Sequence, residues 1–148
     1  MQDIVIPIVK TSEEAEKEWN DLPVEFLWID GNHSHNMVKL DFDLWFPHLI
    51  EGGIIAFHDT FFHPMEGPRK VVIENIYKSR NFINIGLVGS ITFAKKVSNN
   101  SLKDRLRNYC ALLLRYIYEL SFKFTHGLKR YLPKSMKRLG RKILRKKF

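Results

Sequence analysis

Two short polar groups, each directly after an apolar run, hold the residues of this sequence that could do chemistry. They are Asp30-Gly-Asn-His33 and His58-Asp59. The carboxylates of Asp30 and Asp59 and the imidazole of His58 form a donor set that can bind Mg²⁺ or Mn²⁺ and leave positions open for substrate oxygens. His33 is a candidate base that would remove a proton from a substrate hydroxyl group.

A structural interpretation of the same residues is also open. A polar residue that follows a buried strand often caps the next helix or accepts hydrogen bonds from loop amides. Asp59 could serve its loop in this way, and His33 or Ser34 could cap the helix that follows. The presence of these residue types alone therefore does not separate a catalytic role from a structural one.

The hydrophobic pattern predicts that strands and helices alternate along residues 1–97. Apolar and β-branched runs predict strands, while a capping box, apolar spacings of three and four, and a Gly-Pro pair predict helices. The expected strands are residues 3–9, 24–30, 53–58, 82–88 and 91–95, and the expected helices are residues 11–19, residues 36–50 and one that starts at Gly67-Pro68. Gly89-Ser90 predicts a tight hairpin between the last two strands. This order is typical of an open α/β sheet with parallel strands.

Such a sheet would bring the two polar groups together. Ligands of open α/β sheets bind beyond the carboxyl ends of the strands, and both groups stand where a predicted strand ends. Neighbouring strands lie about 5 Å apart. If these two strands are neighbours, Asp30, His33, His58 and Asp59 converge on one ion or substrate. The position of residue 30 relative to residues 58 and 59 is the structural test of this hypothesis.

Length and composition exclude several classes of protein. The 148 residues fit one ordinary domain, and a hydrophobic content of 45% is enough for a folded core. The single cysteine, Cys110, excludes an internal disulfide and a cysteine-rich zinc module. The sequence has neither a secretory signal nor a run of roughly 20 apolar residues. We therefore expect a cytoplasmic protein, with peripheral attachment to a membrane as a further option.

The net charge of +8 is unevenly distributed along the chain. Residues 1–97 contain nine Lys or Arg and fourteen Asp or Glu, whereas residues 98–148 contain fifteen and two. We expect two parts, an α/β segment over residues 1–97 and a basic helical extension over residues 98–148. Apolar spacings of three and four predict that the extension begins with an amphipathic helix, which Gly127 ends, and continues in a second basic stretch over residues 128–148. The apolar positions of the helix are Leu102, Leu106, Tyr109, Leu113, Tyr116 or Ile117, Leu120 and Phe124.

Three interpretations of the basic extension are open. It could lie on an anionic membrane surface through residues 102–148, bind nucleic acid, or pack its apolar face on the sheet or on a partner chain. Nucleic acid is the least favoured partner, because no recognised binding motif accompanies the charge.

Several motifs, in order, resemble the carboxyl-terminal half of a class I S-adenosylmethionine-dependent methyltransferase domain. They are Phe26-Leu-Trp-Ile-Asp-Gly-Asn-His33, then Asp41, Trp45 and Leu49, then Gly52-Gly-Ile-Ile-Ala-Phe-His-Asp-Thr60. The sequence is similar to the O-methyltransferase-like group with IDGxH and GGxIxxHD motifs, which is often found with sugar and polysaccharide biosynthesis. The resemblance covers residue 3 to about residue 96. It implies an α/β fold with the distal strands of a partial Rossmann-like methyltransferase sheet and its final β-hairpin.

The resemblance also implies an activity and residue roles. The activity would be O-methylation of a small molecule or sugar hydroxyl group, with S-adenosylmethionine as cofactor. Asp30 and the pair His58-Asp59 stand at the metal-ligand positions of metal-dependent members, and His33 stands at the position of their basic proton acceptor. The family usually has Asp followed by Asp or Asn where this sequence has His58-Asp59, a departure that bears on metal binding.

The cofactor-binding part of the family pattern is only partly represented. Thr11 and Ser12 follow the strand that borders the adenine pocket in this fold, and they are the cofactor-binding candidates. The family's first strand, its Gly-rich turn and its ribose-binding acidic residue would precede Asp3, and this sequence contains none of them. The resemblance therefore implies the distal part of a methyltransferase domain. We expect this part alone to bind the cofactor weakly or not at all, and thus to be an inactive fragment.

A domain that consists only of these distal strands would expose surfaces that the missing strands normally cover, and it could have a function other than catalysis. The strand over residues 24–29 would have an unpaired edge and uncovered apolar faces, which favour self-association or a partner chain. An alternative function is a non-catalytic binding or interaction module that the basic extension anchors to a partner or a membrane.

Overall fold

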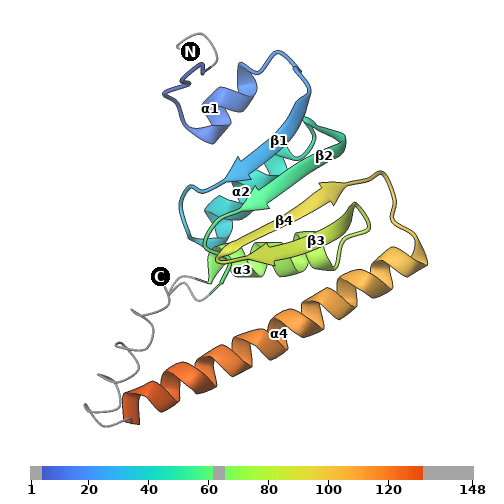
Figure 1. Cartoon of the computed structure of the whole chain (residues 1–148). Helices are drawn as coiled ribbons and strands as arrows, with labels where there is room; N and C mark the ends of the chain where they lie inside the picture. Colours follow the sequence, from blue (N-terminus) through green and yellow to red (C-terminus); the bar gives the residue numbers. More distant parts are fainter. Residues whose placement is uncertain (1–4, 62–65, 132–148) are drawn as a thin grey trace. The chain divides into compact units, whose positions relative to one another are not determined.

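The computed structural model describes residues 5–61 and 66–131 of the chain (Figure 1). Contacts within the chain divide it into two units, Met1–Leu112 and Leu113–Phe148. The four described strands belong to the first unit. The change in composition at residue 98 lies just before the last helix, whereas the division between the units lies within that helix.

The amino-terminal residues form a helix but not the strand expected before it. Residues 5–9 have no regular secondary structure, because no described strand runs beside them as a partner and Pro7 cannot donate a ladder hydrogen bond. Helix α1 (Ser12–Lys17) begins as predicted. The Glu14 amide donates to Thr11 Oγ1 at 3.3 Å, and the Thr11 amide donates to Glu14 Oε2 at 3.1 Å, which confirms the capping box.

Four strands form one mixed sheet in the order β1-β2-β4-β3. Strand β1 (Val24–Ile29) pairs in parallel with β2 (Leu49–Phe57). Strand β4 (Ile91–Lys96) lies between β2 and β3 (Phe82–Val88) and runs antiparallel to both. The parallel pair and the final hairpin are confirmed. The hairpin folds back so that its second strand, not its first, pairs with β2.

Helix α2 (His35–Trp45) ends earlier than the expected residue 50. Pro47 has no amide hydrogen to continue the helical ladder, and Leu49 and Ile50 start β2 instead.

Lys96 forms hydrogen bonds to the segment between α2 and β2: its Nζ donates to Phe46 O at 2.9 Å and to Leu49 O at 2.6 Å. Burial of the Lys96 ammonium lowers its pKa, and nearby Glu51 partly opposes that shift.

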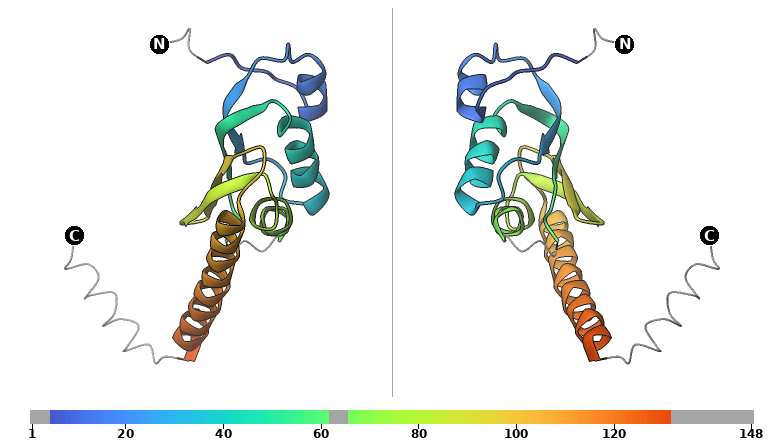
Figure 2. Two further views of the ribbon diagram at one scale, coloured as in Figure 1. Left: turned by 90° about the vertical axis from the view of Figure 1, so that its right-hand side faces the viewer. Right: turned by 90° about the vertical axis from the view of Figure 1, so that its left-hand side faces the viewer.

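Helices cover one face of the sheet (Figure 2). They are α2, α3 (Gly67–Val72) and the π-helical turn η2 (Ile73–Tyr77) that continues α3. Their buried side chains meet those of the strands in one core, where the rings of Phe42 and Phe57 lie 6.2 Å apart and those of Phe46 and Phe82 lie 5.5 Å apart. This core fixes the ends of β1 and β2 relative to each other.

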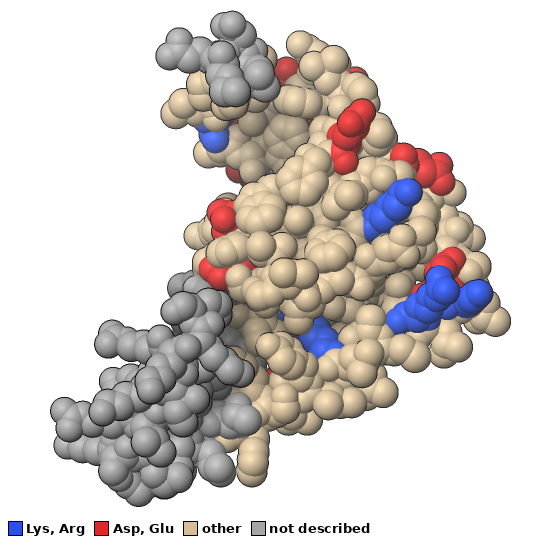
Figure 3. Space-filling view, in the orientation of Figure 1, with Lys and Arg blue, Asp and Glu red and all other residues tan. Residues whose placement is uncertain are grey.

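The opposite face of the sheet carries exposed apolar side chains. Phe26 pairs with Ile54, and Ala56 pairs with both Trp28 and Phe93, so these residues share one face. Phe26, Trp28, Ile54 and Phe93 are all exposed, and Figure 3 shows mostly uncharged surface over this part of the molecule. In the described residues β1 pairs only with β2, so its outer edge is unpaired. Self-association through this surface stays a prediction.

Helix α4 (Leu102–Tyr131) is longer than expected. Gly127 lies inside it, so the prediction that this glycine ends the helix is wrong; a glycine costs a helix interior only about 1 kcal/mol. Asn108 Nδ2 donates to Phe82 O at 2.9 Å, and Leu112 joins the core. No described helix is long and apolar enough to cross a membrane. Residues 132–148 of the predicted second basic stretch lie outside the described residues.

Replacing Asn108 with alanine is expected to lower the free energy of unfolding by about 0.5–1.5 kcal/mol. The Asn108 side chain is buried, and its loss removes one of two side-chain hydrogen bonds to Phe82 O, which also accepts from Asn100 Nδ2 at 3.0 Å. Chemical denaturation measures the change. Arg107→Ala, at the exposed neighbouring position, is the control and should change stability by less than about 0.5 kcal/mol. Equal stability of the two variants would contradict this anchoring role.

Candidate active site

The two polar groups meet at the carboxyl ends of β1 and β2. Ile29 and Phe57 are partners in the parallel ladder, so Asp30 and His58 follow at the same rim. The His58 amide donates to Ile29 O at 3.0 Å, and His58 Nδ1 lies 3.2 Å from Asp30 Oδ1. The structural test of the shared-rim hypothesis is met.

Asp59 connects the two imidazoles of the group. Its Oδ2 lies 3.4 Å from His58 Nδ1 and 3.6 Å from His33 Nε2. The four side chains thus form a series, His33, Asp59, His58 and Asp30, and all four are partly accessible to solvent. An imidazole beside a carboxylate is suited to accept a proton, because the carboxylate stabilises the imidazolium that results. We call these four residues the rim cluster.

The hairpin holds the backbone that carries Asp59. Asp59 has a φ of 49°, a left-handed conformation that Asp tolerates better than most residues. The next residue, Thr60, is fully buried and hydrogen-bonded: its amide donates to Ser90 O at 2.8 Å, its Oγ1 donates to the same carbonyl at 2.9 Å, and its Oγ1 lies 2.6 Å from Thr92 Oγ1. These bonds fix the chain next to an uncommon backbone conformation.

The loop that carries His33 is held between α2 and α3. Asn32 Oδ1 accepts a hydrogen bond from the Ser34 amide at 2.8 Å. Gly67 packs directly against this loop, and a Cβ atom at its position would lie 2.1 Å from His33 O. Ser34 is the N-cap residue of α2 but makes no side-chain cap hydrogen bond. The structure therefore does not give the loop the simple capping role considered from the sequence.

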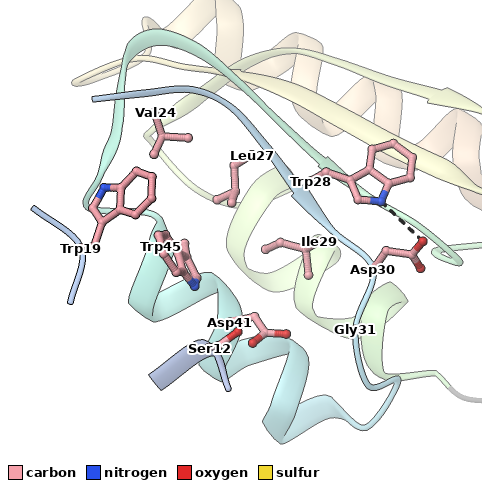
Figure 4. A pocket seen from close by; sticks show the side chains of 10 residues that line it. All are labelled: Ser12, Trp19, Val24, Leu27, Trp28, Ile29, Asp30, Gly31, Asp41 and Trp45. Atoms are coloured by element: carbon pink, nitrogen blue, oxygen red, sulfur yellow. Dashed lines mark hydrogen bonds between the residues drawn. The ribbon is translucent and has the colours of Figure 1, made fainter. Parts of the chain in front are cut away.

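A cavity of about 500 Å³ lies beside the rim cluster, between α1, β1 and α2 (Figure 4). Trp19, Trp28 and Trp45 line it, and they are the three tryptophans of the whole sequence. Asp30 belongs both to the lining and to the rim cluster, and Trp28 Nε1 donates to Asp30 Oδ2 at 3.4 Å. The volume of the cavity falls within the range of small-molecule sites, roughly 300–1,000 Å³.

The two cofactor-binding candidates differ in position. Ser12 lines the cavity, whereas Thr11 is not among the lining residues and its hydroxyl caps α1. The aromatic walls and the nearby Ser12 and Asp30 fit a ligand with an aromatic base and hydroxyl groups, such as the nucleoside part of S-adenosylmethionine. The cofactor-binding roles of both residues stay predictions.

Asp30, His58 and Asp59, the predicted metal ligands, lie together as a hydrogen-bonding group. His58 Nδ1 stands between the two carboxylates, where its proton can satisfy one of them. Within residues 5–61 and 66–131, no group of three or more His, Cys, Asp or Glu side chains has the arrangement of a metal site. As arranged, these side chains do not fit a metal centre, and their assignment as ligands stays a prediction.

The sequence alone does not predict a cavity lined by these aromatic residues. Trp19 and Trp45 make an edge-to-face pair with ring centroids 5.3 Å apart, and Asp41 lies near the backbone of Gly31. The signal available in the sequence was the grouping of its tryptophans within residues 19–45. Periodicity alone places such residues in a core rather than around a cavity.

The chain matches a family model and is similar to a curated relative. Residues 1–60 match a family model described as a methyltransferase domain, which supports the resemblance over that part of the chain. The uncharacterized protein y4gI of Sinorhizobium fredii is 41% identical over 51 residues. That match covers 34% of this chain and 6% of the relative, so the chain spans a small part of the relative's length.

Solved structures of the MycE methyltransferase from the mycinamycin biosynthetic pathway are also similar to this chain. The crystal form with Mg and SAH is 20% identical and has a TM-score of 0.43, with 62% of this chain and 30% of that chain covered. The complex with Mg, SAH and Mycinamycin VI has the same identity and coverage and a TM-score of 0.42. The chain thus spans about a third of those proteins.

Proposed function

We propose that residues 1–97 form part of an S-adenosylmethionine-dependent O-methyltransferase domain, whose acceptor is a hydroxyl group of a small molecule or a sugar. The observation that carries the proposal is the convergence of the rim cluster, from two separate strand ends, beside an aromatic cavity. The family-model match over residues 1–60 supports it independently.

The rim cluster would activate and orient the acceptor. His33 takes the proton of the acceptor hydroxyl at Nε2, and Asp59, 3.6 Å away, stabilises the charged imidazole. Asp30 and His58 orient the acceptor through hydrogen bonds. S-adenosylmethionine would supply the electrophilic methyl group: the acceptor oxygen would bond to the methyl carbon as the carbon–sulfur bond breaks, with S-adenosylhomocysteine as the leaving group. The protein's contributions are alignment and placed charge, and none of these steps depends on a metal ion.

The test has a binding arm and a transfer arm. All three tryptophans of this sequence line the cavity, so titration of a complete homologous domain with S-adenosylhomocysteine should change their emission to saturation. This chain alone, whose sequence contains no Gly-rich turn, should respond weakly or not at all. Methyl-labelled S-adenosylmethionine should then label hydroxylated sugars but not their deoxy analogues. Comparing transfer in the presence of Mg²⁺ or Mn²⁺ with transfer in the presence of a chelator tests the predicted metal role. Loss of transfer with the chelator would support Asp30, His58 and Asp59 as metal ligands and would contradict the metal-free mechanism above.

A non-catalytic binding module is the second candidate, favoured by the exposed apolar face of the sheet. The two arms separate the candidates. A saturable emission change without transfer to any acceptor supports the binding module. Absence of both responses contradicts the cofactor assignment and leaves the methyltransferase proposal without support.

A further inference from the structure

Helix α4 exposes an apolar stripe between Leu106 and Phe124. The members are more than half exposed, with exposed fractions of 54–69%, and they recur at spacings of three and four, so they share one side of the helix. The apolar stripe consists of Leu106, Tyr109, Leu113, Ile117, Leu120 and Phe124. A surface helix of a globular protein normally turns such a stripe toward the core.

The opposite side of the same helix is buried and largely polar. Asn108, Arg115 and Glu119 have exposed fractions of 2%, 3% and 6%. Asn108 bonds to Phe82 O, and Arg115 Nε donates to Glu119 Oε1 at 3.0 Å. The helix is thus inverted: Asn108, Arg115 and Glu119 form hydrogen bonds in buried positions, while large apolar side chains face solvent. Such an exposed apolar surface marks an interaction site.

The exposed charged side chains beside the stripe are all positive. Of the charged residues of this helix up to Phe124, those in exposed positions are Lys103, Arg107 and Lys123. The two acids of this part of the helix lie on other sides of it: Asp104 is partly exposed and Glu119 is buried. At 100° per residue, Lys103 and Arg107 border the stripe on one side and Lys123 on the other. The sequence then adds ten Lys or Arg and no acid over residues 128–148.

We propose that α4 docks with its apolar stripe on the surface of an anionic lipid bilayer. Basic residues along both borders of an apolar face are the pattern of helices that lie in the membrane interface, where the apolar side enters the acyl boundary and the cations meet anionic headgroups. A second copy of the chain fits less well, because pairing two such stripes would place the basic borders of one helix against those of the other, and neither acid of the helix up to Phe124 lies beside the stripe. The helix lies on the bilayer and does not cross it.

Flotation with lipid vesicles tests the proposal on the full chain. We expect binding to vesicles of phosphatidylcholine with about 30% phosphatidylserine to exceed binding to pure phosphatidylcholine at least about tenfold, and to weaken as salt screens the headgroups. Leu113→Glu should lower the partition coefficient about tenfold or more, because it removes apolar contact from the centre of the stripe.

Leu114→Glu is the matched control. Leu114 is as exposed as the stripe and acquires the same charge, but it lies about 100° around the helix from Leu113. This variant should lower binding less than about threefold. Equal loss in both variants, or binding that ignores phosphatidylserine and salt, would overturn the proposal. Self-association that Leu113→Glu abolishes, without vesicle binding by the original chain, would instead identify a second copy as the occupant. Circular dichroism verifies that both variants keep the helix.

Discussion

Replacing His33 with alanine in a complete homologous domain is expected to reduce the turnover number of methyl transfer by about 10²- to 10⁴-fold. An alcohol is a weak nucleophile while it keeps its proton, and His33 is the imidazole that extends the rim cluster beyond β1. Its Nε2 is 3.6 Å from Asp59 Oδ2, so a proton taken by His33 is stabilised in place. Alanine removes the proton acceptor and leaves the cavity residues intact.

The effect should appear in kcat with little change in KM, because the base acts in the transition state. Steady-state measurement with a fixed acceptor separates the two constants. His35→Ala is the matched control: His35 lies two residues farther along, and its Nε2 pairs with Glu74 Oε2 at 3.0 Å, outside the rim cluster. This variant should retain turnover within about threefold. An unchanged kcat in His33→Ala would reject the base assignment.

Replacing Gly67 with alanine is expected to destabilise the fold by about 1–3 kcal/mol and also to lower turnover. On helix propensity alone alanine would stabilise α3 by up to about 1 kcal/mol. Steric overlap with the neighbouring loop makes the substitution destabilising instead, because the added Cβ would lie 2.1 Å from His33 O and 2.7 Å from His35 N. Both are backbone atoms, so relief requires movement of the whole loop that carries His33.

Two measurements on Gly67→Ala test this contact. Denaturant unfolding gives the loss of stability, and kcat under conditions where the variant remains folded reports displacement of His33. Glu66→Ala, at the preceding exposed position, is the control and should alter stability by less than about 0.5 kcal/mol. A Gly67→Ala protein that is as stable and as active as the original chain would exclude the close packing of α3 on this loop.

Much of the sheet and the rim cluster could be predicted from the sequence, because local signals and packing agree there. The predicted strand over residues 24–30 corresponds to β1, which ends at Ile29, directly before Asp30. The turn residues Gly89 and Ser90 connect β3 and β4 as expected, and the Thr11 capping box starts α1. In each case a residue type with a specific backbone or hydrogen-bonding role marks the boundary.

Other features depend on tertiary surroundings that a linear pattern does not contain. Residues 5–9 have strand-forming side chains but no described strand partner. The stripe of α4 has the spacing of a core-facing surface. The other side of the helix faces the core, however, because Asn108 bonds to Phe82 O and Leu112 packs in the core. Periodicity finds an amphipathic helix but not the direction in which each side faces.

The strand order β1-β2-β4-β3 also constrains when the protein can assemble as it is made. Strand β2 ends at Phe57, but the partner on its second side, β4, begins only at Ile91. The Thr60 amide likewise bonds to the Ser90 carbonyl. While a ribosome synthesises residues 58–90, β2 keeps one side open and Asp59 lacks its support. A pause in translation over that interval would leave the edge of β2 unpaired for longer, which would favour aggregation and increase the demand for chaperones.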